Sequence, residues 1–173
     1  MTTFRVRLPQ RQARLVSLAV AYHLARPGSE IDRETMRDYQ HGLREVQPIL
    51  EAQADQEHVI FDLNPLQGTL LSTAFSSTLS ELKMYSLVDT MAGDSNRPRS
   101  TAHGFDDRLR HLFPEVTGDP SYASTLAEEM AMLRREMPFA KAREMLEEER
   151  QAAELQKGRR KKPWQFWKRS PSN

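Results

Sequence analysis

Residues 63–80 read LNPLQGTLLSTAFSSTLS and form the longest stretch of this 173-residue chain without a charged side chain. The stretch begins with Asn64, a good helix cap, and Pro65, which is best tolerated at the first helical position. The residues at helical spacing on one side are Leu71, Ala74, Phe75, Thr78, Leu79, Leu82 and Tyr85. The other side carries Thr69, Ser72, Thr73, Ser76 and Ser80. Because an uncharged helix is usually surrounded by other elements, we predict a central helix over about residues 64–91.

The rest of the chain also favours helices. Glu, Leu, Ala and Arg are plentiful, and 173 residues suffice for one domain with a core. Two narrow apolar stripes repeat with spacings of three and four residues, as in a coiled coil. The first comprises Met36, Tyr39, Leu43, Val46 and Leu50, and the second comprises Tyr122, Leu126, Met130, Leu133, Met137 and Ala140. The stripes can close on each other or on a second copy, so a homo-oligomer is one alternative.

These patterns predict an all-α protein, a small helical bundle with a long bent C-terminal helix. Pro138 divides the helical stretch that runs from residue 121 to about residue 157. We expect an extended basic arm over 1–8, a helical domain over 9–140, a charged helical extension over 141–157 and a disordered basic-aromatic tail over 158–173. The extension has little apolar face, so we expect it to project into solvent.

The N-terminal arm alternates apolar residues and arginines, with Phe4, Val6 and Leu8 on one side. This alternation suits a strand, but a strand without a partner is not stable. A helix is expected from Pro9 to about Ala25. The same region imitates a signal peptide or a mitochondrial presequence, but its apolar core is short, and an ordinary first helix is the preferred interpretation.

Charge is distributed unevenly along the chain, although the formal net charge is only +1. Residues 1–29 hold five arginines and no acid, and residues 157–173 hold seven basic residues and no acid. The segment between them has 13 basic residues and all 24 acids. Either the ends partly neutralise an acidic globule, or they seek an anionic partner.

The C-terminal tail combines charge with exposed aromatic area. Its candidate binding residues are Arg159, Arg160, Lys161, Lys162, Trp164, Phe166, Trp167, Lys168 and Arg169. Basic residues and tryptophans suit the headgroup region of an anionic membrane. They also suit single-stranded nucleic acid, where aromatic rings stack on bases. A groove on a protein partner is a third alternative, and a solubilising tail that folds back onto the domain is the fourth.

Candidate metal ligands recur every four residues at His103, Asp107 and His111. Histidine and carboxylate pairs at this spacing can hold a metal on one helix face. Gly104 places His103 outside the expected helix, however, and a surface ladder of charged residues is the preferred interpretation. The chain has no cysteine, no nucleophile elbow and no phosphate loop, and we expect no cofactor.

The chain contains no segment apolar enough to cross a membrane, because even residues 63–80 carry too many hydroxyl groups. We therefore expect a cytoplasmic protein, with attachment to a membrane surface as an alternative. The predicted function is that of a non-catalytic helical interaction or adaptor protein with a protein partner. The second hypothesis is a nucleic-acid-binding protein that uses both basic ends. The third is a small metal-dependent helical enzyme.

Overall fold

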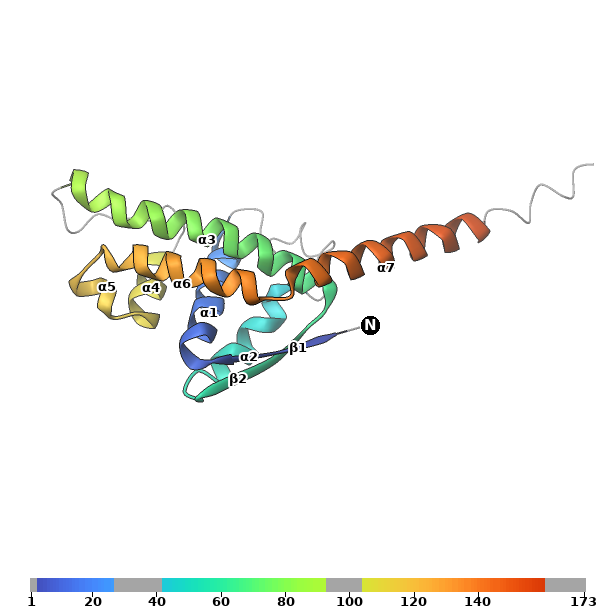
Figure 1. Ribbon diagram of the computed structural model, residues 1–173, viewed down its shortest axis with the longest axis horizontal. Coiled ribbons are helices and arrows are strands. Elements are labelled where there is room, and N and C mark those ends of the chain that lie inside the picture. Colours follow the sequence, from blue (N-terminus) through green and yellow to red (C-terminus); the bar gives the residue numbers. More distant parts are fainter. Residues whose placement is uncertain (1–2, 27–41, 93–103, 161–173) are drawn as a thin grey trace, which may run out of the picture.

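A computed structural model describes the backbone of residues 3–26, 42–92 and 104–160, and the side chains of these residues except at 88–92 and 157–160. The described part is mainly helical, with one small two-stranded sheet (Figure 1). The elements in chain order are β1 (Phe4–Pro9), α1 (Gln10–Ala25), η2 (Leu43–Glu45), α2 (Val46–Ala52), β2 (His58–Leu63), α3 (Pro65–Ala92), α4 (Phe105–Leu112), α5 (Glu115–Gly118), α6 (Tyr122–Glu136) and α7 (Phe139–Arg160). The predicted all-α class is therefore confirmed.

Helix α3 is the predicted central helix and differs from the expected bounds by one residue at each end. Its start is fixed by reciprocal hydrogen bonds. The Gln67 N–H donates to Asn64 Oδ1 over 2.8 Å, and the Asn64 N–H donates to Gln67 Oε1 over 3.0 Å. The predicted inner face is buried at Leu71, Ala74, Phe75, Thr78, Leu82 and Tyr85, and Leu79 is partly buried.

The expectation of an unpaired N-terminal arm is wrong for residues 4–8. These residues lie in β1, which pairs antiparallel with β2 so that Phe4 faces Leu63 and Leu8 faces Val59. The alternation seen in the sequence does place Val6 and Leu8 in the core, with the arginines outside. The missing partner was the segment around Val59, which the sequence shows only as a short apolar run.

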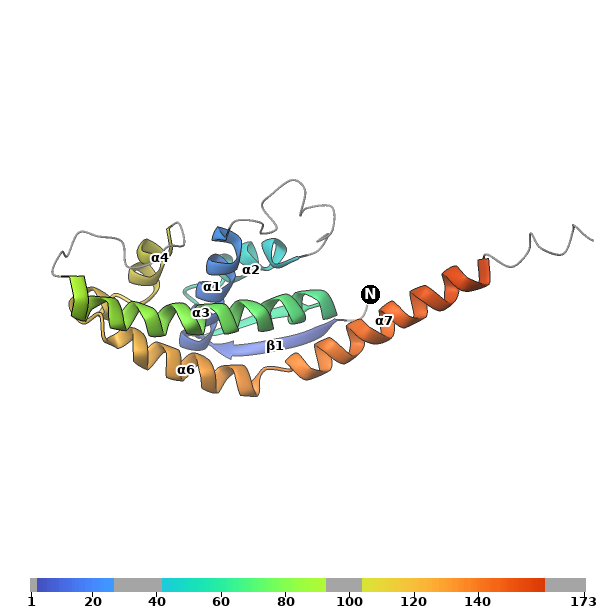
Figure 2. The same ribbon diagram turned by 90° about the horizontal axis from the view of Figure 1, so that it is seen from above.

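The core lies between α3 and the elements that cover its inner face. Helices α1, α6 and α7 pack against it, and α6 runs beside α3 in the opposite direction (Figures 1 and 2). Helix α1 is almost as central, because all residues from Leu15 to Val20 are buried. Gly68 of α3 allows α7 and β1 to approach this helix closely. A Cβ at this position would lie 2.6 Å from the Cβ of Ala142 and 2.8 Å from Cζ of Phe4.

The second apolar stripe is confirmed along α6 and shifts at the bend. Leu126, Met130 and Leu133 are buried, and Met137 has extended backbone with φ −70° and ψ 142°. A residue before proline is driven towards this conformation. The stripe consequently continues at Phe139 and Ala142, and the prediction that Ala140 belongs to it is wrong, because Ala140 is exposed.

The first stripe is described only in its second half. Leu43, Val46 and Leu50 are buried, whereas Met36 and Tyr39 lie outside the described residues. Pro48 is the third residue of α2, where its missing N–H breaks no helical bond.

Polar contacts join segments that are distant in the sequence. Arg11 of α1 donates to both carboxylate oxygens of Glu129 on α6, at 2.8 and 2.9 Å, and to the Tyr122 hydroxyl at 2.6 Å. The bonds to Glu129 raise the pKa of Arg11 above its ordinary value. At the outer edge of β2, the side chain of Gln53 donates to the Ile60 carbonyl and accepts from the Ile60 N–H.

Among the described residues, no helix is long and apolar enough to span a membrane.

Candidate functional site

Helix α7 leaves the body of the protein after its first two turns. Phe139 packs edge-on against Phe75 of α3 with ring centroids 5.5 Å apart, and Ala142 is fully buried. From Glu147 to Gln156, however, every side chain is exposed, and Leu155 retains 71% of its accessible surface. Figures 1 and 2 show this part of the helix extending away from the other elements. We call residues 147–160 the stalk.

The stalk leads directly into the predicted binding residues. Arg159 and Arg160 are the last residues of α7, so the helix continues three residues beyond its expected end at Lys157. A glycine such as Gly158 costs a helix only about 1 kcal/mol relative to alanine, which permits this continuation. The other predicted binding residues, Lys161, Lys162, Trp164, Phe166, Trp167, Lys168 and Arg169, lie outside the described residues.

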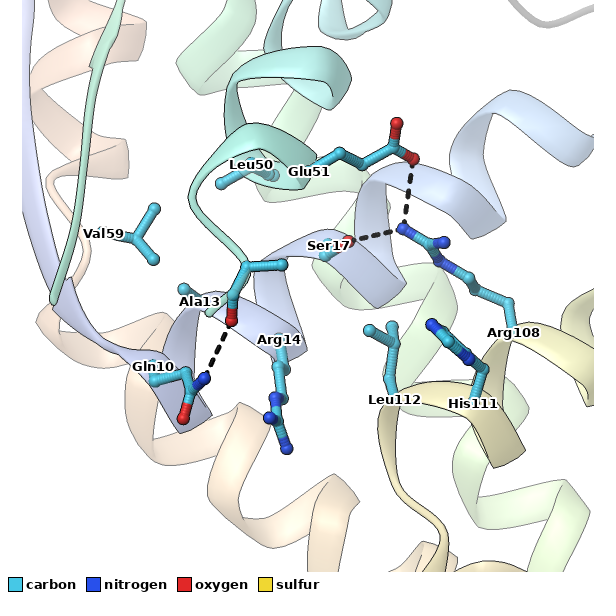
Figure 3. Close-up of a pocket in the computed structure, with 11 residues that line it drawn as sticks. Gln10, Ala13, Arg14, Ser17, Leu50, Glu51, Val59, Arg108, His111 and Leu112 are labelled. Atoms are coloured by element: carbon cyan, nitrogen blue, oxygen red, sulfur yellow. Dashed lines mark hydrogen bonds and ion pairs between the residues drawn. The ribbon is translucent and has the colours of Figure 1, made fainter. Parts of the chain in front are cut away.

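A cleft of about 200 Å³ lies on the body between α1, α2 and α4. Its apolar lining residues are Ala13, Leu50, Ala54, Val59 and Leu112, and its polar lining residues are Gln10, Arg14, Ser17, Glu51, Arg108 and His111. Figure 3 shows that the three basic side chains come from two elements, Arg14 from α1 and Arg108 and His111 from α4.

Arg108 is held by two side-chain hydrogen bonds within the cleft. Its Nη2 atom donates to Ser17 Oγ over 3.1 Å and to Glu51 Oε1 over 3.2 Å. Gln47 Nε2 also donates to the same Glu51 oxygen over 2.9 Å, which fixes the carboxylate in place. The Nε atom of Arg108 is buried without a hydrogen-bond acceptor among the described residues. A buried donor left in this state costs about 1–3 kcal/mol.

The candidate metal ligands are not brought together as a described site. Asp107 and His111 lie one turn apart on the exposed side of α4, and His103 lies outside the described residues. Gly104 precedes the helix with a φ of 71°, a left-handed conformation that glycine adopts because it has no Cβ. Within the described ranges, no group of three or more potential metal ligands is assembled.

The sequence patterns missed the cleft, although part of its signal was visible. Gln10, Arg14 and Ser17 form a polar stripe at helical spacing on α1, a helix whose other side chains are largely apolar. Arg108 and His111 form a similar stripe on α4. Nothing local shows that these stripes face each other, because Ser17 and Arg108 are 91 residues apart.

Comparison with known proteins adds no relative: no protein family, curated protein or solved structure matches this chain.

Proposed function

We propose that this protein is a non-catalytic interaction protein whose stalk carries a basic-aromatic tail to an anionic lipid surface. The observation that supports the proposal most strongly is the exposure of every side chain from residue 147 to residue 156. A helix exposed on all sides gains no burial energy from the body, and a short isolated helix is marginal in water. What this helix contributes is therefore the separation that it gives between its two ends, and not packing.

The stalk places Arg160, the last described residue of the chain, at a distance from the body (Figure 1). At 1.5 Å per residue, residues 147–160 span about 21 Å. This distance is about two and a half Debye lengths at physiological ionic strength. The acids of the body therefore oppose attraction of the tail to an anionic surface only weakly: residues 30–146 hold 20 of the 24 acids against 12 basic residues, and the other four acids, Glu147, Glu148, Glu149 and Glu154, lie on the stalk.

The tail has the composition that such a surface attracts. Residues 157–173 carry seven basic residues and no acid, with Trp164, Phe166 and Trp167 between the two basic clusters. Each lysine or arginine near an anionic bilayer contributes about 1 kcal/mol, and tryptophan favours the headgroup region. The exposed stalk and the tail together support an attachment function that needs no catalytic residues.

Sedimentation of the full chain with lipid vesicles tests the proposal. Vesicles containing phosphatidylserine should bind the protein, and vesicles of phosphatidylcholine alone should not. Replacing Lys161 and Lys162 by glutamine should weaken binding by about 30-fold, the equivalent of about 1 kcal/mol for each charge. The matched control replaces Lys83 and Lys141 by glutamine, because both are exposed lysines on the body.

Four results would overturn the lipid proposal. The first is an absence of binding to anionic vesicles. The second is equal weakening by the tail variant and its control. The third is salt-sensitive binding to a single-stranded oligonucleotide without vesicle binding, which would favour nucleic acid as the partner. Salt-insensitive capture of a protein through Trp164 and Trp167, again without vesicle binding, would instead favour a partner groove.

A further inference from the structure

The cleft between α1, α2 and α4 holds more basic donors than the described residues use. Arg14 is half-buried, yet it makes no hydrogen bond or ion pair with any residue that the structure describes. The same is true of the exposed His111. Arg108 uses only Nη2, which leaves Nη1 without a described acceptor and Nε buried without one.

Glu51 is the one acid among the described residues that line the cleft, and it lies beside Arg108 (Figure 3). Glu51 accepts from Arg108 and from Gln47 through the same oxygen, Oε1. By formal charge, Arg14 and Arg108 against Glu51 give the lining a net charge of +1, with His111 counted as neutral. Glu51 therefore orients Arg108 without neutralising the cleft as a whole.

The remaining lining restricts the size and shape of a ligand. The volume of about 200 Å³ is below the range of about 300–1,000 Å³ that is usual for drug-sized ligands. Leu50, Val59 and Leu112 give the cleft an apolar side next to the basic groups. A ligand that contacts both the apolar side and the basic groups of the cleft combines a small apolar body with an anionic head group.

We propose that this cleft binds a small organic anion whose phosphate or carboxylate group is held by Arg14, Arg108 and His111. Guanidinium groups form strong, charge-assisted hydrogen bonds with either head group. Ser17 and Glu51 hold the Arg108 side chain in place before the ligand arrives, which reduces the entropy lost on binding. The site is on the body and does not depend on the function proposed for the tail.

Titration of the full chain with three small probes, followed by ¹H–¹⁵N NMR, tests the proposal. Phenyl phosphate and benzoate carry the two candidate head groups, and benzamide is a neutral analogue of similar shape. At least one of the two anions should give saturable shifts at the amides of residues 13–17 and 108–112, and benzamide should give none. The tighter of the two anions identifies the head group.

Two variants locate the binding. Arg14→Gln removes a charge that has no described partner, and should weaken anion binding by about tenfold. His111→Ala removes an exposed side chain and should also weaken binding. Arg135→Gln is the matched control, because Arg135 is exposed near the end of α6 and does not line the cleft. The control should bind the anion as the unaltered protein does.

Three outcomes would overturn the assignment. One is that neither anion saturates the shifts below about 10 mM, which corresponds to negligible affinity. Another is that benzamide shifts the same amides to the same extent. The last is that Arg14→Gln and Arg135→Gln have the same affinity for the anion. A loss of vesicle binding by the tail variants would leave these results unchanged.

Discussion

Helices α6 and α7 are neighbours in the chain but differ in how much of their length packs against the body. Both are long and rich in charge, and they are separated only by Met137 and Pro138. Helix α6 buries a continuous stripe against α3, whereas α7 is docked only through its first turns. The difference is in the spacing of the apolar residues. In α6 they recur every three or four residues, and in the stalk glutamates and glutamines interrupt that spacing.

This contrast teaches that helix formation and helix docking are separate properties of the sequence. The residues of the stalk have high helix propensity, which favours a helix there although no packed face supports it. Docking requires an apolar stripe, and that stripe ends at about Leu146. The body therefore depends on α6 and on the start of α7, and should be indifferent to the stalk.

The largest expected effect is that of shortening a buried side chain in α6. Leu126 is completely buried, so Leu126→Ala should lower the free energy of unfolding by about 2–5 kcal/mol, through lost burial and the cavity left behind. Chemical denaturation monitored by circular dichroism measures this change. A loss of less than about 0.5 kcal/mol would show that α6 does not form part of the core.

A smaller effect is expected where α7 docks onto α3. A Cβ on Gly68 would lie 2.6 Å from the Cβ of Ala142, so Gly68→Ala should lower the free energy of unfolding by about 1–3 kcal/mol through overpacking. Ala142→Gly should relieve part of this strain. In a double-mutant cycle, the two changes together should therefore cost less than the sum of the single changes. Strict additivity would contradict the close contact between these helices.

The smallest effect is expected in the stalk. Leu155 is 71% exposed, so Leu155→Ala should change the free energy of unfolding by no more than about 0.5 kcal/mol. The same substitution type at Leu126 provides the comparison, because both changes replace leucine by alanine in a helix. A loss above about 1 kcal/mol at Leu155 would indicate that the stalk is packed against something in solution.

The sequence predicted what depends on local pattern. The cap at Asn64, the buried face of α3 and the break at Pro138 all follow from neighbouring residues, and the structure confirms them. The exposure of the charged stalk follows from the same kind of pattern. These features require no knowledge of how distant segments meet.

The features that the sequence did not predict depend on distant pairing or on register. Strand β1 finds its partner far along the chain, and Arg5 bonds to Asp62 across 57 residues. The exposure of Ala140 follows from the turn of the helix axis at Met137, which a simple count of residues ignores. The cleft was missed for the first reason, because Ser17 and Arg108 meet only in the folded chain.

Hydrogen exchange of the full chain, followed by mass spectrometry, tests most directly whether the stalk stands free of the body. Amides in residues 126–133 should exchange slowly, with protection approaching that of global unfolding, because their side chains are packed against α3. Amides in residues 147–156 should exchange much faster by local fraying, since their helix has no packed face. Equal protection of the two segments in the isolated protein would contradict a free stalk.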